Sequence, residues 1–304
     1  MNGSQIYPEH EKRAAALNSV LAAVGLTATK VVVGVFTGSL GILAEAAHSG
    51  LDLVAAIMTF LAVKFASEPP DPSHLYGHGK VENLSALFET LLLLITCVWI
   101  IYEAVHRLFF RTVEVEVTVW SFAVMVFSIL VDVSRSRMLY RVARKHNSQA
   151  LEADALHFGT DIWSSGVVIL GLACVSLSKW KPQLGFFHEA DAVAALVVAL
   201  IVVYVSLQLG QRTVQGLLDA APLGLEARIK DAVEAIPGVK DCHNLRLRYS
   251  GPRLFVDAHI LVNGNQTLVS AHSLSDLVED RIRQIAPDAD VTVHPEPFLD
   301  APQS

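Results

Sequence analysis

Two stretches of the chain repeat one pattern of metal-binding side chains. His48 and Asp52 are four residues apart, and His157 and Asp161 repeat that spacing. Residues four apart lie one above the other on one face of a helix. Two helices that each present a histidine and an aspartate can close a site with two nitrogen and two oxygen ligands, a set that zinc accepts in tetrahedral geometry. Two carboxylates and two neutral imidazoles also balance the charge of a divalent cation, so the loaded site is neutral.

Composition places most of the chain in a lipid bilayer. Of its 304 residues, 52% are hydrophobic and only 17% are charged, and the mean hydropathy is +0.44. Soluble domains carry about 25% charged residues. The sequence has no basic patch typical of nucleic-acid binding and no glycine-rich phosphate loop ending in Gly-Lys-Ser/Thr, so we expect neither nucleic acid nor nucleotide as a partner. Its three cysteines are too few and too scattered for a disulfide framework.

The apolar residues fall into six runs. Each is long enough to cross about 30 Å of hydrocarbon, and a lipid surrounding requires helices because every backbone polar group must be satisfied within the segment. The sequence therefore predicts an all-α membrane fold, a bundle of six transmembrane helices over residues 13–215 that follows a short N-terminal tail, residues 1–12. The runs cover residues 14–36, 40–65, 82–109, 117–142, 150–177 and 190–209.

Both His-x-x-x-Asp pairs lie inside these runs. Ionisable residues in a membrane are candidates for function because unpaired charge there is expensive. A single membrane histidine is often only a hydrogen-bonded interior residue, but two pairs of the same spacing make that explanation hard to sustain. Glu45 and Asp154 lie one helical turn before the two pairs. They are candidates for supporting partners of the ligands or for proton acceptors. The alternative, which we favour for Asp154, is a charge at the membrane interface.

Basic residues predict the orientation of the bundle. Six spans place both termini on one side of the membrane, together with the loop between the fourth and fifth runs. Cytoplasmic loops carry an excess of lysine and arginine, so we expect the N-terminus and the C-terminal third in the cytoplasm. The basic residues in or next to this loop are Arg135, Arg137, Arg141, Arg144 and Lys145.

A polar loop after the second run carries another candidate metal site. Three prolines in this loop exclude a helix. Asp71, His74 and His78 can converge because Gly77 and Gly79 let the chain turn. Three ligands with an open position describe a weaker, exchangeable metal site. The alternative is a loop whose histidines cap the third helix.

The pattern of a small soluble domain begins near Pro222, within a cytosolic segment that we bound at residues 216–304. Helix, two strands, helix and a last strand in about 80 residues are typical of an α+β domain of the ferredoxin-like or metallochaperone-like kind. The helices are predicted over residues 225–236 and 268–285, and the strands over 239–249, 253–262 and 290–294.

Four features together resemble one protein family. They are the HSGLD and HFGTD helices, the motif His-Leu-Tyr-Gly-His-Gly-Lys at residues 74–80, the six spans and the small C-terminal domain. The family is the cation diffusion facilitators, and the resemblance covers nearly the whole chain. The resemblance implies a homodimeric secondary transporter rather than an enzyme. The chain lacks the histidine-rich insertion between helices four and five that is common in eukaryotic zinc transporters of this family, which favours a bacterial member in the cytoplasmic membrane. It departs from the bacterial pattern that puts aspartate at the His48 position, and an imidazole there should favour zinc over manganese or magnesium.

The resemblance also implies two features of the cytosolic domain. A charge interlock between Lys80 and Asp219 would tie this domain to the membrane helices; the alternative is two unrelated surface charges, because exposed pairs contribute little. Cys242 is either a soft ligand of a cytosolic metal site or, as we favour, a free thiol. The residues that match the family's cytosolic metal site are His243, His259, His272, His294 and Glu296.

We therefore expect a proton-coupled antiporter that exports a divalent metal, Zn²⁺ before others, from the cytoplasm. Histidine titrates near neutral pH, so protons and metal compete for the same imidazole nitrogens. Zinc is expected as cargo and as a structural or regulatory ion of the cytosolic domain. One alternative is an exporter of Fe²⁺, Mn²⁺ or Cd²⁺, and another is a membrane metal sensor or scaffold that transports nothing. A scaffold has no need of a complete ligand set inside the bilayer.

Overall fold

A computed structural model describes residues 6–38, 40–110, 119–180 and 187–298, and the chain divides into two compact units. The first unit is Met1–Val214 and the second is Gln215–Ser304. We describe each unit by itself.

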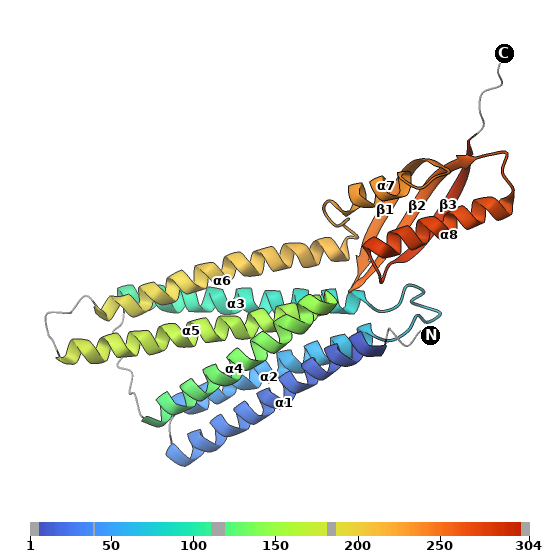
Figure 1. Ribbon diagram of the computed structural model, residues 1–304. Coiled ribbons are helices and arrows are strands. Elements are labelled where there is room, and N and C mark those ends of the chain that lie inside the picture. Colours follow the sequence, from blue (N-terminus) through green and yellow to red (C-terminus); the bar gives the residue numbers. More distant parts are fainter. Residues whose placement is uncertain (1–5, 39, 111–118, 181–186, 299–304) are drawn as a thin grey trace. The chain divides into compact units, whose positions relative to one another are not determined.

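Six long helices build the first unit, as the apolar runs predict (Figure 1). Four of them are long and apolar enough to cross a membrane within the described residues, at Glu9–Thr37, Glu45–Ala66, Lys80–Tyr102 and Leu196–Leu217. The helical bundle is therefore confirmed, whereas the count of six spans stays a prediction. The helices are α1 (Ile6–Thr37), α2 (Leu40–Ala66), α3 (Lys80–Phe110), α4 (Val119–His146), α5 (Gln149–Trp180) and α6 (Phe187–Leu217).

The N-terminal tail is shorter than predicted, because α1 already begins at Ile6. Three consecutive polar residues of this first part of α1 each have a partner on another element. Glu11 lies 2.5 Å from the Lys145 ammonium at the end of α4, and the buried Lys12 ammonium lies 2.8 Å from a Glu82 carboxylate oxygen of α3. Arg13 donates to the Ser67 hydroxyl just after α2. These contacts explain why a polar stretch is helical here.

Arg135 is not a loop charge, contrary to the prediction. Its side chain is buried in α4, where it donates to the Ser19 hydroxyl of α1 at 3.0 Å. Its guanidinium lies 3.5 Å from the centre of the Phe158 ring of α5, a favourable stacking for arginine. The exposed basic residues at the C-terminal end of α4 are Arg137, Arg141, Arg144 and Lys145. The predicted orientation of the bundle in the membrane stays a prediction.

A tight α4–α5 junction positions the second His-x-x-x-Asp pair. Asn147 has φ of 51°, a left-handed conformation that asparagine tolerates and that ends helices. The Ser148 hydroxyl then accepts from the Leu151 amide at the start of α5, as an N-capping side chain does. The next turns of α5 bury Leu151 and Phe158 against Leu139 and Val63. His157 is therefore held two turns inside a packed helix.

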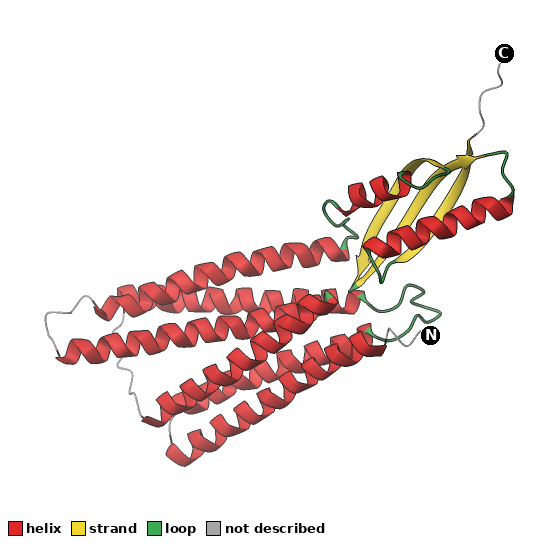
Figure 2. Cartoon of the chain, viewed as in Figure 1, coloured by secondary structure: helices red, strands yellow, loops and turns green. Residues whose placement is uncertain are grey.

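The second unit is the predicted α+β domain (Figure 2). Its three-stranded sheet has the order β1-β2-β3, with β1 antiparallel and β3 parallel to β2. The last strand runs farther than predicted, to Phe298. The elements are α7 (Leu225–Glu234), β1 (Val239–Ser250), β2 (Arg253–Asn263), α8 (Leu268–Ile285) and β3 (Asp290–Phe298).

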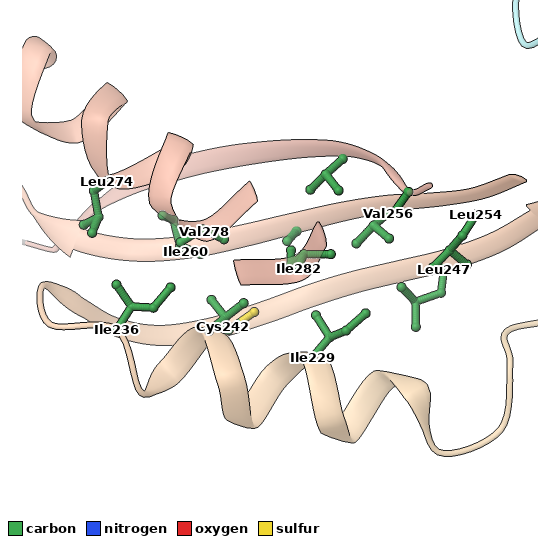
Figure 3. Close-up of a cluster of buried hydrophobic side chains, with 14 of the residues drawn as sticks. Ile229, Ile236, Cys242, Leu247, Leu254, Val256, Ile260, Leu274, Val278 and Ile282 are labelled. Atoms are coloured by element: carbon green, nitrogen blue, oxygen red, sulfur yellow. The ribbon is translucent and has the colours of Figure 1, made fainter. Parts of the chain in front are cut away.

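Both helices of this unit share one apolar core with the sheet (Figure 3). Ile229 of α7 and Val278 of α8 are fully buried in it, together with alternate residues of β2 such as Val256 and Ile260. Side chains of successive strand residues point to opposite faces. The residues between these, including His259, therefore face away from the helices.

Candidate metal centres

The two His-x-x-x-Asp pairs converge between α2 and α5. The His157 Nε2 atom lies 3.2 Å from an Asp52 carboxylate oxygen and 3.8 Å from one of Asp161. The His48 Nε2 atom lies 3.9 Å from an oxygen of Asp52 and 3.9 Å from one of Asp161. Each histidine thus faces both aspartates, one from its own helix and one from the other. His48, Asp52 and Asp161 each offer a ligand atom within 4.8 Å of the others, and His157 contacts both aspartates. A tetrahedral zinc site needs ligands at about 2.0–2.2 Å, so the four side chains would draw closer around a cation.

Among the described residues, Glu45 and Asp154 both have partners outside the four ligands. Glu45 lies 3.2 Å from the Lys30 ammonium, which also donates to Ser49. Asp154 is fully buried and accepts from the Ser19 hydroxyl, and its place at the membrane interface stays a prediction. Lys30 and Ser19 both belong to α1, so this helix supplies the polar partners that the sequence spacing could not reveal.

The sequence reasoning missed Glu89 of α3, which is 1% exposed. One of its carboxylate oxygens accepts from the Thr59 hydroxyl of α2. The signal was present in the sequence, since Glu89 is an ionisable residue inside an apolar run and such residues are candidates by default. Asp132 of α4 is a second ionisable residue inside an apolar run that was not among the predicted site residues. One of its carboxylate oxygens lies 3.4 Å from the Arg135 guanidinium.

The loop between α2 and α3 brings its three predicted ligands together. One Asp71 carboxylate oxygen lies 3.3 Å from His74 Nδ1 and the other 3.3 Å from His78 Nε2. Gly77 has φ of +77°, the turn that the sequence predicts. The Ser73 hydroxyl and the His74 amide donate to Asp71, and these hydrogen bonds hold the pKa of its carboxyl well below the ordinary value. The carboxylate is therefore ionised throughout the neutral range, as a metal ligand must be.

The alternative role of these histidines, capping α3, has no support in the described hydrogen bonds. The amides of Val81 and Glu82 at the start of α3 are bonded to the backbone carbonyls of His78 and Gly79. The His78 side chain faces Asp71 instead, and its buried Nδ1 atom has no hydrogen-bond partner among the described residues.

A row of three histidines crosses the open face of the C-terminal sheet. His243 of β1 pairs in register with His259 of β2, and His259 pairs with His294 of β3. Glu296 is two residues beyond His294 and so lies on the same face. Its two carboxylate oxygens lie 2.7 Å from His259 Nδ1 and 3.2 Å from His243 Nε2. His294 Nε2 is 4.0 Å from the same carboxylate.

This donor set fits a metal ion. His243, His259 and Glu296 each offer a ligand atom within 4.8 Å of the others, and imidazole and carboxylate are ligands that zinc accepts. The His259 ring is hydrogen-bonded to Glu296, and the pKa of the Glu296 carboxyl is lowered by that bond and by the nearby charge of His243. The Glu296 carboxyl is therefore ionised in the neutral range, as a carboxylate ligand must be.

Two residues of the predicted cytosolic site stand apart. His272 lies on α8, which packs on the other face of the sheet, and its recorded contact is Asp276 at 3.9 Å. Within one chain it does not join the other four residues, so its predicted place in this cluster is wrong for a single protomer. Cys242 points into the apolar core, and this burial raises the pKa of its thiol to about 11. It is a free thiol, not a ready thiolate ligand.

The proposed interlock joins residues of different units. Lys80 is the first residue of α3. Within the C-terminal unit, an Asp219 carboxylate oxygen lies 3.7 Å from the Arg248 guanidinium. The pairing of Asp219 with Lys80 stays a prediction.

Comparison with known proteins places this arrangement in a family. Residues 16–218 match the cation efflux transmembrane domain, and residues 223–298 match the cytoplasmic domain of cation efflux proteins. The chain belongs to the cation efflux family. Among its relatives is the cation-efflux pump FieF of Salmonella typhimurium, 34% identical over 307 residues that cover 99% of this chain and 97% of the pump. The FieF pump of Salmonella paratyphi A is 33% identical with the same coverage.

Solved structures of another protein's C-terminal domain match the C-terminal part of this cation efflux protein. A MamM C-terminal-domain fragment is 28% identical, covers 24% of this chain and 95% of its own, and has a TM-score of 0.24. A nickel form of a MamM C-terminal-domain variant is 26% identical, covers 25% of this chain and 96% of its own, and has the same TM-score. The match to the transmembrane domain and to the full-length relatives indicates that the chain is an integral membrane transporter of divalent cations.

Proposed function

We propose that this transporter exports Zn²⁺ from the cytoplasm in exchange for protons. The convergence of His48, Asp52, His157 and Asp161 between two helices of the bundle supports this proposal most directly. Two imidazoles in a four-ligand set favour zinc over the harder manganese and magnesium ions, which prefer oxygen. The runner-up is export of Fe²⁺, Mn²⁺ or Cd²⁺ through the same site.

Competition for the imidazole nitrogens provides the coupling. A histidine binds metal only through a deprotonated nitrogen, so metal loading releases protons and proton binding releases metal. Rocking of helix groups around a fixed site near the bilayer midplane would expose the four ligands to each side in turn. A sensor that transports nothing would bind zinc but move none. Metal flux into proteoliposomes across a metal panel, under a controlled pH gradient, tests the proposal and separates these alternatives.

The loop residues Asp71, His74 and His78 fit an exchangeable metal site on the cytoplasmic side of the protein. Three ligands from one short loop leave an open coordination position, which suits rapid exchange. We propose that cytosolic zinc binds at this loop before it reaches the four-ligand site.

The histidine row of the C-terminal unit serves, in our proposal, as a zinc-responsive clamp of a homodimer. We expect a fragment that starts at Gln215 to be dimeric, and zinc to raise its melting temperature and compact it. An ion that binds only the folded form stabilises it by about 2.7 kcal/mol at a hundred times its dissociation constant. Replacing His259 and Glu296 together by alanine should remove most of this response. These two side chains are the closest pair of the row, with His259 Nδ1 2.7 Å from a Glu296 carboxylate oxygen.

Calorimetry and small-angle scattering of the fragment, with and without zinc, measure that response. The control is Asp288→Ala, which removes an exposed acidic residue outside the row. If zinc changes neither the melting temperature nor the scattering radius of the fragment, the clamp proposal is wrong. The histidines are then ordinary residues of a dimerisation domain.

A further inference from the structure

Glu89 is a buried carboxyl of α3 that the four-ligand site does not use. It is 1% exposed, and its Oε1 atom accepts from the Thr59 hydroxyl of α2. Its Oε2 atom has no hydrogen-bond partner among the described residues, and no lysine or arginine of that part of the chain is recorded as its ion-pair partner. A buried carboxylate without a compensating charge is expensive, so such a group keeps its proton.

Asp154 provides the contrast within the same bundle. It is also fully buried, but its Oδ2 atom accepts from Ser19, and Ser19 accepts from the Arg135 guanidinium. A cation therefore belongs to the Asp154 network. Each carboxyl has one oxygen without a hydrogen-bond partner among the described residues. Glu89 has a neutral hydroxyl as its partner and, within the described part of the chain, no cation in its network, so of the two carboxyls it is the one suited to gain and lose a proton.

Glu89 lies at the depth of the metal ligands. The starts of α3 and α5 are side by side, because Asn83 donates to Gln149 at 3.0 Å. At about 1.5 Å per residue, Glu89 lies roughly 9 Å beyond Asn83 along α3, and His157 roughly 12 Å beyond Gln149 along α5. The charges of Asp154 and His157 both act on the Glu89 carboxyl.

The remaining neighbour of this part of α3 is apolar. Leu209 of α6 packs with Ala86 of α3 and Ala153 of α5, and Gly210 approaches Thr90. The titratable groups that face Glu89 from the packed helices are thus Asp154 and His157 of α5, with Thr59 as the polar partner from α2.

We propose that Glu89 is a proton-binding residue of the transport cycle. The proposal rests on the proton exchange proposed above and adds a carboxyl outside the ligand set. A divalent cation in the four-ligand site places positive charge near Glu89, which favours its carboxylate, so the carboxyl releases one H⁺ as metal loads. Departure of the cation reverses this balance, and the carboxylate takes up one H⁺. Glu89 then contributes one proton to each exchange.

Glu89→Gln in the full-length protein tests this role. Glutamine keeps the shape and the acceptor for Thr59 but cannot titrate. Two assays in proteoliposomes are compared: exchange of labelled for unlabelled Zn²⁺ at equal pH, and Zn²⁺ uptake driven by a pH gradient with an enclosed pH-sensitive dye. We expect Glu89→Gln to retain exchange and to lose the acceleration by the pH gradient together with part of the proton signal. Glu89→Asp, which keeps a titratable group, should restore both.

The outcomes separate this role from the proposed function. Glu152→Gln, which changes a carboxylate near the start of α5 that pairs with Arg212, is the matched control and should behave as the unmodified protein. Undiminished gradient-driven uptake in Glu89→Gln would overturn the role of Glu89 while leaving proton exchange intact. Loss of Zn²⁺ exchange in the same variant would also overturn it, because that result indicates a structural role. Unmodified protein that moves zinc without protons would instead refute the exchange itself.

Discussion

Asp52→Ala is expected to abolish zinc transport while the helix bundle stays folded. Asp52 faces both histidines, at 3.2 Å from His157 and 3.9 Å from His48. Even the loss of an outer hydrogen-bond partner of a metal ligand costs roughly 10–100-fold in affinity or activity, so the loss of a ligand should cost at least about 100-fold. Asp161 still faces both histidines after this change, so neither imidazole is left without a carboxylate partner and we expect an intact fold.

Zinc uptake into proteoliposomes measures this loss, and size-exclusion chromatography in detergent checks the fold. Asp161→Ala should give the same result, because Asp161 faces the same two histidines from α5. Normal flux in either variant would contradict a four-ligand transport site.

His48→Asp is expected to broaden metal selectivity. The site would then hold three carboxylates and one imidazole, so a bound divalent ion would leave a net negative charge. Oxygen ligands suit harder ions than imidazole does, and we expect gains for iron, manganese or cadmium relative to zinc. The His48 side chain is 45% exposed, so the shorter aspartate should fit without disturbing the packing.

Competition of each metal against labelled zinc uptake measures this selectivity. His10→Asp makes the same chemical change at an exposed position of α1 and should leave the order of metals unchanged. If His48→Asp also leaves that order unchanged, His48 does not touch the transported ion.

The convergence of the two His-x-x-x-Asp pairs was predictable because helix geometry is local. A spacing of four fixes the face of a helix whatever surrounds it, so His48 and Asp52 could be paired from the sequence, and the repeat at His157 supplied the second half. The sequence did not reveal which side chains would partner the other buried carboxyls of the bundle. Ser19 of α1 reaches Asp154, and Thr59 of α2 reaches Glu89, only through helix packing.

The cytosolic cluster shows where composition misleads. The histidines of β1, β2 and β3 align because the strand register sets them side by side, and that register includes an irregularity just after His243. A count of histidines could not separate this row from His272, which lies on the helix that covers the opposite face. The helical start of α1 was missed for a similar reason, since its polar residues are paired with distant helices.

The central claim is the exchange of zinc for protons through the four-ligand site. Its most direct test follows zinc entry and internal pH in the same proteoliposomes, with unmodified protein and Asp52→Ala side by side. We predict that zinc entry is accompanied by proton exit, that an inward-directed zinc gradient alone drives this exit, and that Asp52→Ala loses both signals together. Zinc entry without any proton movement, or undiminished signals in Asp52→Ala, would contradict this account.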